Sequence, residues 1–190
     1  MKLQHPATFD VPELLDIVDT TKLSTFISRV AKYAQQQDPD LYDPLAYMGD
    51  CWEVFGEFFF KFFNGDHTLT YTSDYEPNLD VDQGIDGRGI STLDGKPNVI
   101  QFKYKKDPKA WITNEENPSN LISEAVSEGV EHNGKNIIYF TSCMGIHKAH
   151  TASKYHSINR KEIARRVDGN VVFWDNFKRV IMETTEDIDG

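Results

Sequence analysis

The hydrophobic pattern of the chain changes its period at Asn64-Gly65, and this change restricts the fold more than any other feature. Before this point, the apolar residues between Met48 and Phe63 recur at helical spacing. After it, strand patterns come first and then alternate with helical patterns. Strand patterns occupy residues 67–73, 84–92, 97–105, 136–142 and 171–175, and helical patterns occupy residues 117–130, 147–167 with a break at Ser157, and 176–184. This order predicts an α/β domain with a mixed central β-sheet flanked by helices.

The N-terminal region is expected to be helical. Asp10 is placed to cap a helix that has Pro12 in its first turn, and residues 21–37 carry a second apolar stripe. Asp43 and Pro44 then open the long aromatic helix. We therefore expect three parts, a helical extension packed on the core, an α/β domain and an acidic tail, at residues 1–42, 43–184 and 185–190.

The composition excludes several classes of protein. The chain has 190 residues, of which 39% are hydrophobic, as in ordinary globular proteins. It begins without the apolar stretch of a signal peptide, and its apolar runs are too short to cross a membrane. Two cysteines, Cys51 and Cys143, are too few for a disulfide framework. We therefore expect a cytoplasmic protein.

The charge of the chain is negative overall but unevenly distributed. A net charge of −10 argues against a protein that coats DNA without specificity, because such binding comes from neutralising phosphates. Twelve acids and one base lie between Asp38 and Asp86, whereas eight bases and three acids lie between Gly145 and Val180. This distribution predicts a basic side that is available for phosphates.

Chemically active side chains lie on the strand predicted at residues 97–105. Alternation puts Gln101 and Lys103 on one face, roughly 6–7 Å apart. Burying a lysine is costly unless a partner compensates, and Asp86, in the neighbouring segment GIDGRG, is the candidate. The glycines of that segment leave room for a ligand or another backbone. An acid, an amide and an amine together favour metal-assisted hydrolysis of a phosphodiester, because Mg²⁺ takes oxygen ligands and lysine orients water.

These segments resemble the core of the PD-(D/E)XK nuclease superfamily, in its Mrr-like restriction endonuclease branch. DQGID, a glycine-containing turn and VIQFK are similar to the G-[IV]-D strand and the Q-x-K strand of that branch, in which Gln replaces the usual second acid. The pair Trp52-Glu53 is similar to the aromatic-Glu pair of the family's helix. The resemblance covers residues from about Asp43 to Met182.

The resemblance implies a restriction-endonuclease-like fold with a metal site. It implies that Asp86 binds Mg²⁺ or Mn²⁺, that Gln101 completes the site and that Lys103 is the catalytic lysine. Glu53 would be the helix carboxylate that helps to hold the metal.

Other acids near the motif have more than one interpretation. Glu57 has a structural explanation as the i,i+4 partner of Lys61, so we prefer Glu53 as the site residue. Asp80 and Asp82 are either loop acids or additional metal ligands.

The remaining candidates concern zinc and nucleic acid. The cysteine and three histidines between residues 143 and 156 are irregularly spaced, unlike the tight pairs of structural zinc sites. Trp111 and Trp174 are expected to pack in the core or in loops rather than to stack on bases. Phosphate contacts are expected from five basic residues, with solvated surface as the alternative for each: Lys105, Lys106, Lys109, Lys154 and Arg160.

Together, these observations predict a metal-dependent DNA endonuclease that hydrolyses phosphodiester bonds. The alternative is a noncatalytic nucleic-acid-binding or assembly module that retains the fold, which the missing second acid and the negative charge favour. The expected partners are DNA, a second copy of the chain for double-strand cleavage, and a helicase or other domain if the chain belongs to a longer protein. No membrane partner is expected.

Overall fold

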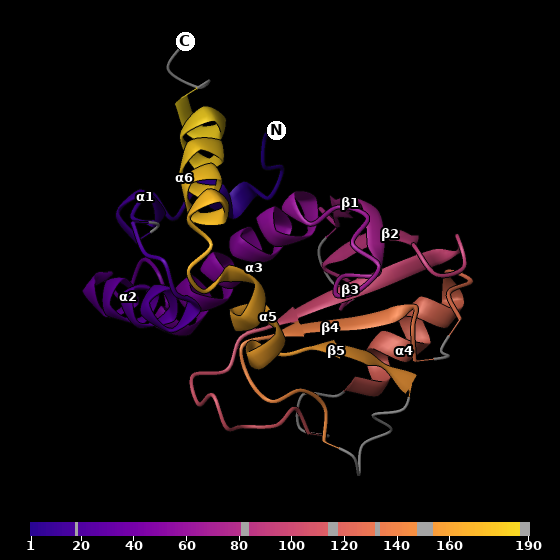
Figure 1. The fold of residues 1–190 in the computed structure, drawn as a ribbon. Coiled ribbons are helices and arrows are strands. Elements are labelled where there is room, and N and C mark those ends of the chain that lie inside the picture. The colour runs from indigo at the N-terminus through magenta and orange to yellow at the C-terminus, as the bar shows by residue number, and fades with distance from the viewer. Residues whose placement is uncertain (18, 81–83, 114–117, 132–133, 148–153, 187–190) are drawn as a thin grey trace. The chain divides into compact units, whose positions relative to one another are not determined.

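The structure, a computed structural model of the chain, describes residues 1–17, 19–80, 84–113, 118–131, 134–147 and 154–186 (Figure 1). The chain forms two compact units. The first contains residues 1–58 and 163–190, and the second contains residues 59–162. Helices α3 (Pro44–Phe62) and α5 (Arg160–Val167) each contribute residues to both units.

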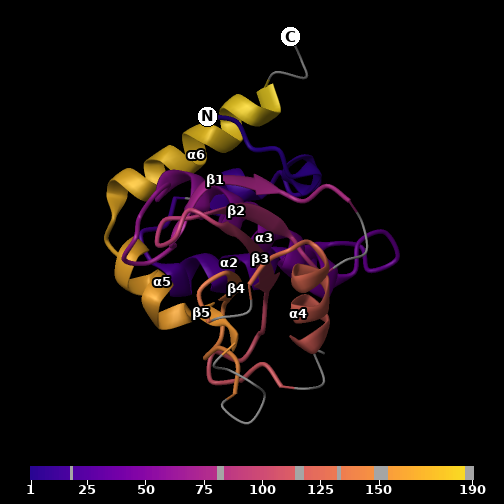
Figure 2. The same cartoon turned by 90° about the vertical axis from the view of Figure 1, so that its right-hand side faces the viewer.

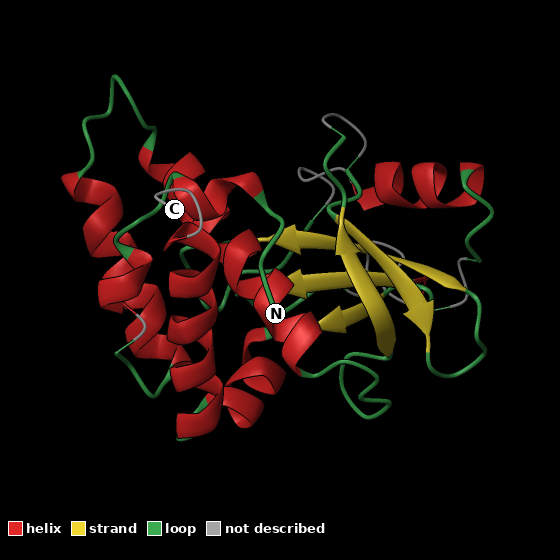
Figure 3. Ribbon diagram, turned by 90° about the horizontal axis from the view of Figure 1, so that it is seen from above, coloured by secondary structure: helices red, strands yellow, loops and turns green. Residues whose placement is uncertain are grey.

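The second unit is built on a five-stranded sheet, drawn in yellow in Figure 3. In spatial order, its strands are β1 (Thr72–Pro77), β2 (Gly87–Ser91), β3 (Pro97–Lys103), β4 (Ile137–Thr141) and β5 (His156–Ile158). The pairs β1–β2 and β2–β3 are antiparallel, whereas β3–β4 and β4–β5 are parallel. The predicted α/β fold with a mixed central sheet is therefore confirmed.

Helices cover both faces of this sheet within the second unit. Helix α4 (Pro118–Ser127) lies beside the strands in Figures 1 and 2. It shares one buried apolar core with the sheet, which includes Leu121, Ala125, Val99, Ile137 and Tyr139. On the other face, the ring of Phe60 at the end of α3 contacts the ring of Phe102, with 6.0 Å between centroids. Neighbouring residues of β3 thus point to opposite faces, as predicted.

The glycines of β2 make room for side chains of β1. A Cβ atom on Gly87 would lie 2.3 Å from the ring of Tyr75, and one on Gly89 would lie 2.3 Å from Cγ2 of Thr72. Tyr75 is buried, and its ring stacks on Phe60 at 5.1 Å between centroids. The space at Gly87 and Gly89 is therefore filled by the neighbouring strand and does not hold a ligand.

The first unit is helical. It contains the 3₁₀ helix η1 (Pro6–Phe9), α1 (Leu14–Ile17), α2 (Leu23–Gln36), most of α3, and α6 (Val171–Glu186). Rings of α2, α3 and α6 meet in an aromatic core, in which Phe55 contacts both Phe26 and Trp174. The Asp43 carboxylate accepts from the Ala46 N–H at 3.0 Å, which confirms the predicted cap of α3. No helix in the described part of the chain is long and apolar enough to cross a bilayer.

Two predictions about the N-terminal helices have different outcomes. The helix expected over residues 21–37 is confirmed as α2. The helix expected after Asp10 is present as α1, but it begins only at Leu14 and has a single turn, and the predicted cap at Asp10 is wrong. Asp10 ends η1, where its N–H donates to the Ala7 carbonyl at 2.9 Å.

The strand predicted at residues 171–175 is also wrong. This segment is the first part of α6, which runs without interruption to Glu186. Asn170 caps the helix, since its Oδ1 accepts from the Phe173 N–H at 3.0 Å. Val171 and Val172 are exposed, whereas Phe173, Trp174 and Phe177 are buried, which is a helical spacing.

The helix predicted over residues 147–167 is shorter than expected. Residues 156–158, around the expected break at Ser157, form β5 and pair with the fully buried strand β4. Helix α5 begins only at Arg160, where Oδ1 of Asn159 accepts from the Glu162 N–H at 3.0 Å. Residues 148–153 lie outside the described residues.

Gly87→Ala is expected to destabilise the protein by about 2 kcal/mol, because the new methyl group meets the Tyr75 ring. Gly49→Ala is the matched control. Gly49 lies inside α3, nothing lies within 4 Å of its Cβ position, and alanine there should stabilise by about 0.5–1 kcal/mol. Urea unfolding of both variants measures the difference. Equal stability of the two variants would contradict the packing of Tyr75 on Gly87.

Candidate functional site

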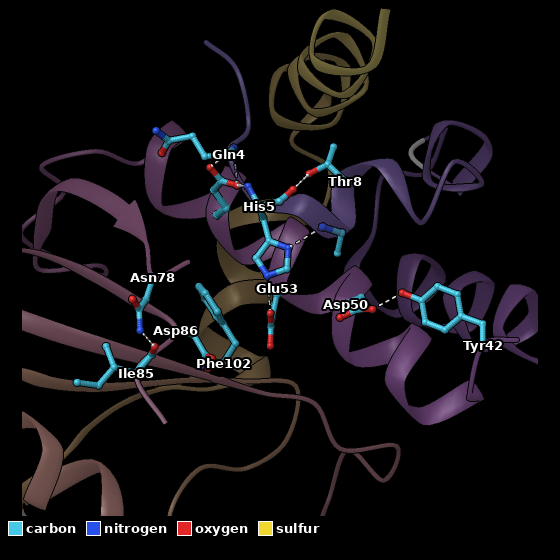
Figure 4. Close-up of polar contacts among 12 residues, drawn as sticks. Gln4, His5, Thr8, Tyr42, Asp50, Glu53, Asn78, Ile85, Asp86 and Phe102 are labelled. Carbon is cyan, nitrogen blue, oxygen red and sulfur yellow. Dashed lines mark hydrogen bonds and ion pairs between the residues drawn. The ribbon is translucent and has the colours of Figure 1, made fainter. Parts of the chain in front are cut away.

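Asp86 lies directly before β2 and is held by hydrogen bonds on several sides. Its N–H donates to the Ile100 carbonyl at 2.9 Å, and its carbonyl accepts from the Asn78 N–H at 2.8 Å. Its Oδ2 accepts from the Phe102 N–H at 2.8 Å. The side chain of Asn78 also donates to the Ile85 carbonyl at 2.7 Å (Figure 4). The carboxylate of Asp86 is therefore fixed against the main chain of β3.

The strand register brings Asp86, Gln101 and Lys103 to the same face of the sheet. Gly87 pairs with Ile100, so Asp86 comes level with Gln101 across the antiparallel pair. Opposed residues in such a pair share a face, and Lys103 follows Gln101 by two positions. The Nε2 atom of Gln101 lies 3.9 Å from the Cβ position of Gly84, in the loop that carries Asp86. The predicted grouping of these three residues agrees with this register.

Lys103 ends β3 with its side chain half-buried. Its main chain pairs with Thr141 of β4, and its carbonyl accepts from the Ser142 N–H at 3.3 Å. Within the described part of the chain, its ammonium group forms no hydrogen bond or ion pair. A half-buried cation on the same sheet face as a carboxylate, without a partner among the described residues, is suited to bind an anionic oxygen of a ligand.

The donor chemistry of this face fits a hard divalent cation. Asp86 offers a carboxylate and Gln101 an amide oxygen, and Mg²⁺ is commonly held by one or two carboxylates plus water and substrate phosphate. Among the residues that the structure describes, no group of three or more His, Cys, Asp or Glu side chains converges. With Gln101 in the place of a second acid, Asp86 is the carboxylate that this set of three residues offers to a cation.

Glu53 belongs to the first unit, where it is bound by a residue that the sequence did not indicate. Nε2 of His5 lies 2.6 Å from Oε2 of Glu53 (Figure 4). The Ala7 N–H donates to Nδ1 of His5 at 3.1 Å, which leaves Nε2 to carry the hydrogen that Glu53 accepts. Burial lowers the pKa of His5, but the hydrogen bond to Glu53 and the charges of Glu53 and Glu57 outweigh it, so the net pKa is raised. Glu53 remains the predicted helix carboxylate of the metal site.

Glu57 has a structural role. It is fully buried, and its carboxylate accepts from the Gln4 N–H at 2.8 and 3.0 Å and from the His5 N–H at 2.9 Å. The N-terminal segment is thus tied to α3 through main-chain donors. These bonds give Glu57 a structural role, and the preference for Glu53 as the site residue stays a prediction.

The predicted phosphate contacts fall at two places in the second unit. Lys105, Lys106 and Lys109 follow β3 directly, and Lys106 and Lys109 are exposed. Arg160 follows β5, which runs parallel to β3 and β4, so it lies toward the same end of the sheet. Lys154 precedes β5 and lies toward the opposite end.

The remaining predicted ligands are loop residues. Asp80 is exposed, and its N–H donates to Oδ1 of Asn78 at 3.3 Å. Asp82 lies outside the described residues, as does His150. Cys143 is fully buried, with its Sγ 3.0 Å from Oγ1 of Thr141.

Comparisons with known proteins found one distant structural likeness. No family model and no curated protein matches the chain. A solved structure described as MspJI restriction endonuclease in complex with a 27-mer oligonucleotide is similar, with a TM-score of 0.39 and 13% sequence identity. The match covers 84% of this chain and 34% of that chain. The present chain therefore spans about a third of the length of that protein.

Glu57→Gln is expected to destabilise the protein by about 2 kcal/mol, because an amide supplies one acceptor oxygen where the carboxylate supplies two. Glu53→Gln is the matched control, with the same chemical change on the same helix. Because Glu53 is partly exposed, Glu53→Gln should lower the free energy of unfolding by less than about 1 kcal/mol. Urea unfolding followed by tryptophan fluorescence compares the two. If Glu57→Gln is as stable as Glu53→Gln, the three main-chain bonds do not hold the N-terminal segment.

Proposed function

We propose that this chain is a metal-dependent DNA endonuclease with a restriction-endonuclease-like fold. One observation carries the proposal. The carboxylate of Asp86 and the amide of Gln101 share a half-exposed face with the ammonium of Lys103, which forms no hydrogen bond or ion pair with any residue that the structure describes. The resemblance of these residues to the D…QxK motif of Mrr-like nucleases supports the same conclusion.

Each of the three residues has a distinct role in the proposed reaction. Asp86 and Gln101 would hold Mg²⁺ or Mn²⁺ through oxygen atoms, and such a metal would supply activation of water and neutralisation of phosphate charge. Lys103 binds a non-bridging phosphate oxygen and the attacking water, and its charge offsets that of the transition state. The Phe102 N–H holds the Asp86 carboxylate in one orientation during these events.

Glu53 is the fourth residue of the proposal. The resemblance of Trp52-Glu53 to the family's helix motif supports a role in holding the metal. The hydrogen bond from His5 fixes one oxygen of Glu53.

A second candidate function is a noncatalytic nucleic-acid-binding module. The absence of a three-acid cluster among the described residues favours it, because most two-metal sites need more carboxylates. The two candidates differ in whether the Asp86 face binds a metal ion.

Asp86→Asn and Lys103→Ala are each expected to reduce plasmid cleavage by at least about 100-fold in the presence of Mg²⁺ or Mn²⁺. An Asn oxygen still accepts from the Phe102 N–H, so Asp86→Asn removes the charge without removing the bond. Lys96→Ala is the control, because Lys96 lies in the β2–β3 turn at the other end of the sheet and pairs with Glu131. Cleavage that survives both site substitutions would exclude this site as the catalytic centre.

Calorimetric titration with Mn²⁺ is expected to show binding to the wild-type protein that is lost in Asp86→Asn, because the amide removes the only charged ligand of the Asp86–Gln101 pair. Lys96→Ala should bind Mn²⁺ as the wild type does. The absence of metal binding together with intact DNA binding would instead favour the noncatalytic module.

A further inference from the structure

Two loops extend the sheet beyond the ends of β3 and β4 and are joined to each other. Ile112 and Ile146 form an isolated parallel bridge. The Ile112 N–H donates to the Gly145 carbonyl at 2.8 Å, and the His147 N–H donates to the Ile112 carbonyl at 3.0 Å. Both isoleucines are buried in the core that lies under α4. The two loops therefore form a rigid extension of the sheet rather than independent segments.

This extension presents two rings to solvent. Trp111 and His147 are neighbours of the buried isoleucines, and both are exposed, Trp111 by 37%. Their ring centroids lie 5.6 Å apart and their planes are nearly perpendicular. The interpretation of Trp111 as an ordinary packing residue is therefore incomplete, because the bridge holds its ring at the surface against His147.

Trp111 lies in the loop that follows the candidate catalytic strand, and this loop also carries cations. Lys103 ends β3, and Trp111 lies eight residues further along the chain. The Ser142 hydroxyl accepts from the Lys105 N–H at 2.7 Å and donates to the Lys105 carbonyl at 2.9 Å, which ties the start of this loop to β4. Lys106 and Lys109 are exposed on the same loop. Sites for single-stranded nucleic acid combine these two features, a cationic track for the backbone and aromatic rings for the bases.

We propose that Trp111, held by His147, stacks on an unpaired nucleobase of a DNA strand whose phosphates contact Lys105, Lys106 and Lys109. Bases within a duplex stack on one another and offer no free face to a side chain. The substrate class is therefore DNA with an unpaired nucleotide beside the scissile phosphate, as in a single strand or an overhang. That this DNA is also cleaved rests on the proposed nuclease function, whereas its binding to Trp111 does not.

Trp111→Ala is expected to weaken binding of a short single strand by about 5-fold or more and to leave binding of the corresponding blunt duplex nearly unchanged. Trp111→Phe should retain most of the affinity, because phenylalanine keeps a ring for stacking. Anisotropy of a labelled oligonucleotide in EDTA measures binding without cleavage. Leu93→Ala is the control, because Leu93 is an exposed apolar residue in the β2–β3 turn.

A strand with abasic nucleotides separates stacking from phosphate binding. It carries the same charge as the normal strand, so wild-type protein should bind it about as weakly as Trp111→Ala binds the normal strand. The substitution should then cause no further loss on the abasic strand. If Trp111→Ala weakens single strand, duplex and abasic strand equally, or none of them, the stacking proposal is wrong. Because these measurements contain no metal, failure of plasmid cleavage would overturn the proposed function and leave this result standing.

Discussion

The antiparallel register between β2 and β3 is the constraint on which the candidate site depends. Gly87 lies opposite Ile100, and the Asp86 N–H extends the ladder by one bond to the same residue. A slip of one residue would turn Gln101 and Lys103 to the face that packs on α3, because side chains alternate along a strand. The contacts of the Phe102 ring with the rings of Phe60 and Tyr75 oppose such a slip, because it would move Phe102 out of this cluster. The packing of these rings thus contributes to the geometry of the candidate site.

The strands β2, β3 and β4 could be predicted from the period of their apolar residues, because turn residues bound them. The strand expected at residues 67–73 lies instead at Thr72–Pro77, and β5 was not predicted. The error at residues 171–175 has a physical cause. Four apolar residues in a row fit a buried strand and the start of a helix equally well. Two features favour the helix over the strand here. The side chain of Asn170 accepts from the Phe173 N–H, and the buried residues that follow recur at helical spacing. A cap of this kind depends on a single residue, whereas the apolar run spans four, so the run dominates a prediction from sequence.

Part of the candidate site could be predicted because it depends on local strand geometry. The face shared by Gln101 and Lys103 follows from strand geometry, and the glycine-rich turn marked Asp86. The partners of Glu53 and Glu57 were not predictable, because they lie about fifty residues away in sequence and bind in part through main-chain N–H groups. Every residue except proline has such a donor, so no residue type signals where it will be used.

The amide at Gln101 changes the electrostatics of the proposed site more than its geometry. The charges of Asp86 and Lys103 cancel, so these two residues and Gln101 carry no net charge before a metal binds, whereas a carboxylate at position 101 would make the set negative. A neutral face attracts a divalent cation less strongly, and the phosphate of the substrate supplies the missing negative ligand. Metal and DNA should then stabilise each other's binding by mutual charge neutralisation. In the proposed function, the cationic loop from Lys105 to Lys109 would attract phosphate to a protein whose net charge of −10 otherwise repels it.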